Sequence, residues 1–144
     1  MKTLFIACGN PLRRDDGVAS EVLRYLAQAE NREWRVVHQL TPELADEAAR
    51  FDRVVFLDAD IHAARVTIEP VGLGWSRGAS VPRSPLTHSA TPAEIVAIAS
   101  GMFGFAGEAL LCRIPARDFS AGTSLSRDTA PFARQAAEEL ENLL

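Results

Sequence analysis

The feature that most constrains the fold of this 144-residue chain is the alternation of two kinds of apolar segment. Short runs rich in β-branched and aromatic residues, typical of strands, alternate with segments whose apolar residues recur at helical spacing. The expected order of elements is β-α-β-α-β-β-α-β-α. This order favours a mostly parallel, twisted sheet with helices on both faces. We therefore predict one three-layer α/β domain over residues 1–144, with about five strands, one of them antiparallel.

The expected strands are Lys2–Ala7, Glu33–Leu40, Phe51–Ala59, Ala64–Pro70 and Glu108–Pro115. The expected helices are Val18–Gln28, a segment that begins at Thr41, a segment from Pro92 to Gly104, and Asp128–Leu144. Residues 51–59 contain a continuous apolar run, which is typical of a central parallel strand. Residues 64–70 end at a proline and follow too closely for a helical crossover, so we expect an antiparallel edge strand there.

Composition limits the possible partners. The chain is 47% hydrophobic, which is enough for a substantial core, and its formal net charge is −4. Basic residues are scattered along the sequence, so it shows no footprint for nucleic acid or an anionic membrane. The apolar start is too short for a signal peptide or a membrane span. Cys8 and Cys112 lie in apolar runs and are expected to be reduced, buried thiols. We expect a cytoplasmic monomer.

The stretch Cys8–Gly17 connects the first strand to the first helix. A glycine, an asparagine and a proline form its turn, and Asp15 and Asp16 stand where the helix should begin. Carboxylates at a helix N-terminus are favoured by ~0.3–1 kcal/mol, so simple capping would account for the pair. However, functional sites in open α/β sheets collect beyond the carboxyl ends of the strands, where this turn lies.

Two other polar groups have comparable positions. Asp58 and Asp60 end the central strand, and His88 precedes a helix that should begin with Thr91 as its cap. Two carboxylates and an imidazole from separate segments could form an open site for a divalent metal. Residues 72–89, which are rich in Gly, Pro and Ser, should form a long functional loop that flanks this site.

Each candidate also has a purely structural explanation. Asp58 and Asp60 could cap the turn that follows their strand, and capping suits Asp60 better. His88 could bond a loop carbonyl, and His38 and His62 are rival imidazoles. The sequence leaves open whether Asp60 or His62 contributes to the site.

Several other chemistries are excluded or weakened by the sequence. The turn at residues 8–11 matches neither GxGxxG nor GxxxxGK[ST], which argues against a dinucleotide or nucleoside triphosphate site. No serine lies in a GxSxG context, so a serine-hydrolase elbow is absent. Cys8 is expected to be a small buried hydrophobe, because no basic residue is forced next to it by sequence.

Residues 9–17, Gly-Asn-Pro-Leu-Arg-Arg-Asp-Asp-Gly, resemble the GNxLxxDDG signature of the hydrogenase maturation endopeptidases. These enzymes trim the large-subunit precursor of nickel-iron hydrogenases. Residues 55–59 resemble the second acidic motif of the family, and Thr87-His88 before a capped helix resembles its histidine motif. Weak similarity, including residues 122–126, covers nearly the whole chain.

The resemblance implies a function and a set of site residues. The family's metal ligands and catalytic groups would fall on Asp16, Asp58 and His88, with Asp15 as a neighbour at the helix start. The protein would be an endopeptidase that removes the carboxyl-terminal extension of a hydrogenase large-subunit precursor after nickel insertion. Nickel would be carried by this precursor and recognised there, rather than held permanently by the enzyme.

The sequence departs from the family pattern at two places, of which the second bears on substrate choice and leaves the ligand set intact. Cys8, with the preceding alanine, stands where many relatives have a glycine, and residues 38–44 replace the family's Asp-Gly-Gly-Thr turn. Two other functions fit the sequence: a non-catalytic nickel-binding chaperone on the same fold, and a cysteine hydrolase using Cys8 and His88. The sequence does not identify the hydrogenase, the cleavage-site residue or the attacking nucleophile.

Overall fold

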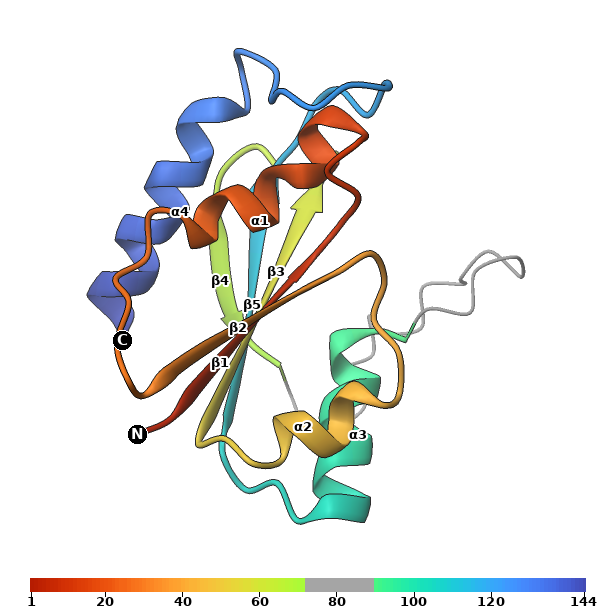
Figure 1. Cartoon of the computed structure of the whole chain (residues 1–144), viewed down its shortest axis with the longest axis vertical. Coiled ribbons are helices and arrows are strands. Elements are labelled where there is room, and N and C mark those ends of the chain that lie inside the picture. Colours follow the sequence, from red (N-terminus) through yellow and green to blue (C-terminus); the bar gives the residue numbers. More distant parts are fainter. Residues whose placement is uncertain (72–89) are drawn as a thin grey trace.

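The computed structural model describes residues 1–71 and 90–144, which form a sheet between two layers of helices (Figure 1). The strands are β1 (Thr3–Cys8), β2 (Arg32–Val37), β3 (Arg53–Asp60), β4 (Thr67–Pro70) and β5 (Glu108–Pro115). The helices are the 3-10 turn η1 (Arg14–Gly17), α1 (Val18–Leu23), α2 (Leu44–Ala48), α3 (Pro92–Phe103) and α4 (Ala130–Leu143). The sheet order is β2-β1-β3-β5-β4, and only the edge strand β4 is antiparallel, to β5. The predicted fold class is confirmed.

Side chains that alternate along the central strands supply two separate cores. Phe5 and Val55 face the core that α1 and α4 close, whereas Leu4 and Phe56 face the core that α2 and α3 close. All four side chains are almost completely buried. Because β1 and β3 are covered on both faces, they need apolar residues at consecutive positions, as the sequence pattern indicated.

Parallel pairing brings the carboxyl ends of β1, β3 and β5 to one edge of the sheet. The pairing register places Cys8 beside Asp58 and Asp58 beside Arg113. The connections 9–13, 61–66 and 116–129 all lie beyond this edge (Figure 1). We refer to it as the carboxyl edge, and it contains the residues that the sequence selected for chemistry.

Two helices are shorter than predicted. The first begins as the tight turn η1 and its α-helical part ends at Leu23, after which Arg24, Tyr25 and Leu26 continue with i to i−3 bonds. The second begins at Leu44, because the three residues from Thr41 form a turn that precedes it. By contrast, α3 has the predicted signals: the Thr91 side chain accepts from the Glu94 N–H, and Gly104 ends the helix with φ 74°.

The structure describes only part of the chain, which affects the predicted loop and the search for membrane-spanning helices. The predicted loop 72–89, with His88 near its end, lies outside them. Within residues 1–71 and 90–144, none of the helices has the length and apolar character needed to cross a membrane.

Two glycines form a matched test of the packing. A Cβ on Gly107 would lie 2.2 Å from the backbone oxygen of Asp52, whereas a Cβ on Gly101, within α3, would meet no atom within 4 Å. We expect Gly107→Ala to lower the free energy of unfolding by ~1–3 kcal/mol, because the backbone must shift. Gly101→Ala should raise it by ~0.5–1 kcal/mol, because alanine is the better helix former. Urea unfolding of both variants measures these changes, and equal stability of the two would contradict the packing described here.

Candidate functional site

Asp16, in η1, and Asp58, near the end of β3, lie close enough at the carboxyl edge for their charges to interact. Asp58 lines a hollow and is therefore accessible to solvent. The protein atoms that form the hollow nevertheless displace part of the water that would hydrate its carboxylate. This loss of hydration, followed by repulsion from the charges of Asp16 and Asp60, raises the pKa of Asp58 to about 6. The structure therefore brings Asp16 and Asp58 to one edge of the sheet, while their roles as metal ligands or catalytic groups stay a prediction.

The turn before η1 holds Asp16 in place. The backbone N–H of Asn10 donates to Oδ2 of Asp16 at 2.8 Å. Gly9 has φ 149°, and a Cβ there would lie 2.0 Å from the backbone oxygen of Asp16. Only glycine both adopts this conformation readily and leaves that space empty. The close approach of the turn to Asp16 thus explains the glycine of the motif, whereas the Asn10 side chain accepts the Leu12 N–H within the turn.

Asp15 has a different role, which the sequence did not reveal. It is completely buried, and its carboxylate accepts five hydrogen bonds of 2.7–2.9 Å from residues far along the chain. The donors are the backbone N–H groups of Arg117, Asp118 and Ser126 and the hydroxyls of Ser126 and Thr129. Asp15 therefore joins η1 to the loop between β5 and α4.

The hydrogen bonds keep Asp15 ionised despite its burial. Burial opposes ionisation, but the bonds from Ser126, Arg117 and Asp118 outweigh it and lower the pKa of Asp15 to about 2. The expectation that Asp15 merely neighbours the site at a helix start understates its role. The only sequence signal of this role was the weak motif similarity at residues 122–126, because donors more than 100 positions away form no local pattern.

A hollow of about 300 Å³ lies beside Asp58, and Cys8 and His38 also line it. The Cys8 thiol donates to the His38 carbonyl oxygen at 3.7 Å. Partial burial, followed by the negative charges of Asp58 and Asp16, raises the pKa of Cys8 to about 12. Cys8 is thus protonated near neutral pH, and the two departures from the family pattern, at Cys8 and His38, meet in one place.

The remaining candidates are distributed as follows. Oδ1 of Asp60 accepts the His62 N–H at 2.8 Å, so Asp60 caps the turn after β3. His62 is exposed and contributes its backbone to that turn, whereas His38 lines the hollow. His88 lies outside the described residues. Within the described part of the chain, no three His, Cys, Asp or Glu side chains are grouped to hold a metal ion.

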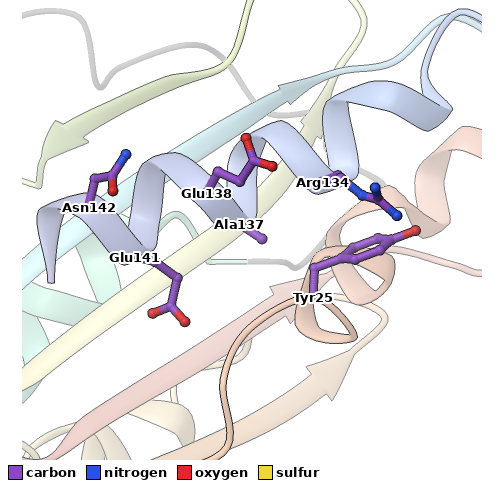
Figure 2. A pocket seen from close by; sticks show the side chains of 6 residues that line it. All are labelled: Tyr25, Arg134, Ala137, Glu138, Glu141 and Asn142. Atoms are coloured by element: carbon purple, nitrogen blue, oxygen red, sulfur yellow. The ribbon is translucent and has the colours of Figure 1, made fainter.

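A second hollow, of about 520 Å³, lies between α4 and the chain just after α1 (Figure 2). In it the Arg134 guanidinium lies over the Tyr25 ring, with Cζ 5.1 Å from the ring centroid. Neither Asp16 nor Asp58 lines this hollow. Its larger size does not make it the better candidate, because the paired carboxylates lie at the carboxyl edge.

No protein-family model and no curated protein matches this sequence. Solved structures do match. The hydrogenase maturating endopeptidase HybD from E. coli superposes with a TM-score of 0.75 at 15% identity, over 100% of this chain and 92% of that one. The [NiFe] hydrogenase maturation protease HycI from Thermococcus kodakarensis KOD1 has a TM-score of 0.72 at 18% identity, over 99% and 92%. HybD from Thermococcus kodakarensis has a TM-score of 0.66 at 22% identity, over 99% of both chains.

These identities are low, but the superpositions extend over almost the full length of each pair of chains. The chain therefore has the fold of the hydrogenase maturation proteases. This agrees with the fold that the sequence motif implied.

Removal of the Asp15 carboxylate should destabilise the protein strongly. Asp15→Asn leaves several buried donors without an acceptor, at ~1–3 kcal/mol each, so we expect a loss on the order of 3 kcal/mol in the free energy of unfolding. In wild type, the ionised Asp15 carboxylate stabilises the folded state at pH values above its ordinary pKa of 3.8. This stabilisation is lost as the pH falls towards the folded-state pKa of about 2. Urea unfolding between these pH values should therefore show a smaller pH dependence in Asp15→Asn. The exposed Asp128→Asn is the control, and equal stability of both variants would contradict the role assigned to Asp15.

Asp58→Asn should have the opposite effect. In the folded protein the pKa of Asp58 is about 6, above the ordinary value of 3.8. Ionisation of Asp58 therefore destabilises the folded state. This destabilisation grows from about pH 4 to about pH 6 and is complete above about pH 6. Solvent screens part of this repulsion, so we expect Asp58→Asn to raise Tm by roughly 2–4 °C at pH 7.5 and by almost nothing at pH 4. Asp60→Asn keeps an oxygen for the His62 N–H and should raise Tm less. A lower Tm for Asp58→Asn at pH 7.5 would contradict the electrostatics described here.

Proposed function

We propose that the protein is a hydrogenase maturation endopeptidase that removes the carboxyl-terminal extension of a nickel-iron hydrogenase large-subunit precursor after nickel insertion. The main support is the pair Asp16 and Asp58, whose mutual repulsion is retained at the carboxyl edge. Like charges that destabilise the folded protein are typical of functional sites. The shared fold with maturation proteases of E. coli and Thermococcus kodakarensis gives the pair its context.

In this proposal the two carboxylates and His88 bind the nickel that the precursor already carries. Asp16 is oriented by the Asn10 N–H, so its second oxygen is free to face the metal. Asp58 contributes the second carboxylate from the adjacent strand end. An incomplete ligand set suits a metal held mainly by another protein, because open coordination positions remain for the precursor's own ligands. Nickel then marks a finished centre and positions and polarises the scissile bond.

The hollow beside Asp58 is proposed to receive a substrate side chain next to the scissile bond. Its volume of about 300 Å³, at the small end of ligand pockets, is large enough for one side chain. Cys8 and His38 form part of its wall. Because these residues depart from the family pattern, we assign to the hollow the choice among hydrogenase precursors.

Two alternative functions make different predictions. A nickel-binding chaperone on this fold would bind the same precursor without cutting it. A cysteine hydrolase would need the Cys8 thiolate, but the pKa of about 12 leaves almost none of it ionised near pH 7. The endopeptidase is favoured over the hydrolase for this reason.

The decisive experiment is processing of the purified precursor, nickel-loaded and nickel-free, by wild type and by Asp16→Asn, Asp58→Asn and His88→Ala. We expect wild type to cleave only the nickel-loaded form. Each substitution should lower the rate by at least ~10–100-fold, since changes even behind metal ligands have effects of that size. Cleavage of the nickel-free form, or full activity of any of the three variants, would contradict the mechanism.

Neighbouring residues provide the controls. Asp60→Asn and His62→Ala alter the capped turn after β3 and should keep activity within a few-fold of wild type. Cys8→Ser should remain active, and its inactivity would support the cysteine hydrolase instead. Precursor binding without cleavage by wild type would identify the chaperone.

A further inference from the structure

Most arginines in the described part of the chain are neutralised by a carboxylate. Seven of them form ion pairs there: Arg14, Arg24, Arg32, Arg35, Arg50, Arg53 and Arg113. Arg134 lies over the ring of Tyr25 instead. Four others, all exposed, have no carboxylate partner within residues 1–71 and 90–144: Arg13, Arg65, Arg117 and Arg127.

The four unpaired arginines all lie on connections beyond the carboxyl edge (Figure 1). Arg13 lies between β1 and η1, Arg65 between β3 and β4, and Arg117 and Arg127 between β5 and α4. They therefore lie at the same edge of the sheet as Asp16 and Asp58.

The hydrogen bonds of Asp15 hold two of these arginines in place. The Arg117 backbone N–H donates directly to the Asp15 carboxylate, and Arg13 lies two residues before Asp15. Their side chains donate to backbone carbonyls, Arg13 to that of Phe119 at 3.1 Å and Arg117 to that of Ala116 at 2.9 Å. A carbonyl orients a guanidinium without neutralising it, so both arginines retain their full positive charge.

We propose that Arg13, Arg65 and Arg117, the arginine rim, bind an acidic surface of the folded protein substrate; this rests on the proposed function. The rim comes from three connections at the edge that also holds the carboxylates Asp16 and Asp58, so acidic and basic groups meet there. We refer to the two carboxylates as the acidic centre and to the arginine rim as the basic border. An acidic surface meets the border while a metal cation or the chain to be cut enters the centre. Arg127 is left out of the rim because Asp128 follows it directly and offsets its charge, whereas Asp118, which follows Arg117, already pairs with Arg14.

A nucleic acid fits this edge less well than a protein does. A polyanion would have to cross the acidic centre, and the net charge of the chain is −4. A protein surface can place its acidic groups against the border alone. Charges at the border of an interface act mainly on the association rate and on its salt dependence.

Processing kinetics of the nickel-loaded hydrogenase large-subunit precursor test the rim. We expect Arg13→Glu, Arg65→Glu and Arg117→Glu each to raise KM by about 3- to 10-fold at about 50 mM salt, with kcat unchanged. The increase should largely disappear at about 300 mM salt, where the charges are screened. Arg50→Glu changes the net charge equally from an exposed position just after α2, before β3 begins, and should leave KM unchanged.

Arg65→Glu is the cleanest variant, because the Arg65 side chain makes no hydrogen bond within the described residues. The salt dependence of wild-type KM needs no variant at all. Equal KM values for the rim variants and Arg50→Glu, or a wild-type KM independent of salt, would overturn the rim. Loss of duplex DNA binding in the rim variants, with unchanged precursor KM, would overturn it in favour of a nucleic acid.

Failure of the proposed function can be distinguished from failure of the arginine rim. If wild type cleaves no precursor, the endopeptidase proposal fails, and calorimetric binding of the same precursor by the same variants then tests the rim. Salt-sensitive binding that the rim variants weaken would support the rim even in that case, and unchanged binding would overturn it.

Discussion

The buried carboxylate of Asp15 organises the functional edge of this protein. A charge without exposure to water is tolerated only when hydrogen bonds replace its hydration, and here three backbone N–H groups and two hydroxyls do so. These donors come from the loop between β5 and α4, so one side chain joins two segments far apart in sequence. The conformation of η1, and with it the position of Asp16, depends on this connection. The Arg14 side chain reinforces the connection, because it pairs with Asp118 of the same loop. Arg14 has φ 43°, a left-handed backbone conformation that is uncommon for a residue other than glycine.

Asp15 and Asp58 show how one chain uses carboxylates for opposite purposes. Asp15 is surrounded by donors, which lower its pKa, so its ionised form stabilises the fold. Asp58 faces other carboxylates and lies where hydration is reduced, which raises its pKa, so its ionised form destabilises the fold. The first arrangement is structural, whereas the second is the kind of strain that functional sites retain. A bound cation would relieve the repulsion at Asp58 and leave Asp15 unaffected.

The departures from the family motifs are not spread over the molecule. Cys8 ends β1 and His38 follows β2, yet the parallel pairing of these strands brings the two together in the hollow beside Asp58. The turn that follows Cys8 keeps the motif residues: the Asn10 N–H orients Asp16, and Gly9 has no Cβ to clash with the Asp16 backbone oxygen. Substitution of residues that line the hollow can change which substrate side chain fits into it without moving the adjacent carboxylates Asp16 and Asp58. Under the proposed function, this arrangement would separate substrate choice from the chemistry of the edge.

Local patterns in the sequence determined the order of elements, the central position of Phe51–Ala59, the antiparallel edge strand, and the start and end of α3. These features depend on side-chain periodicity and on capping residues a few positions apart, so they can be read locally. The sequence also identified Asp16 and Asp58 as neighbours, because carboxyl ends of parallel strands share one edge. It did not determine the role of Asp15, the lengths of the first two helices, or the grouping of arginines that are scattered along the chain. The role of Asp15 and the grouping of the arginines depend on hydrogen bonds and proximities between segments up to 114 residues apart, which only the tertiary structure creates.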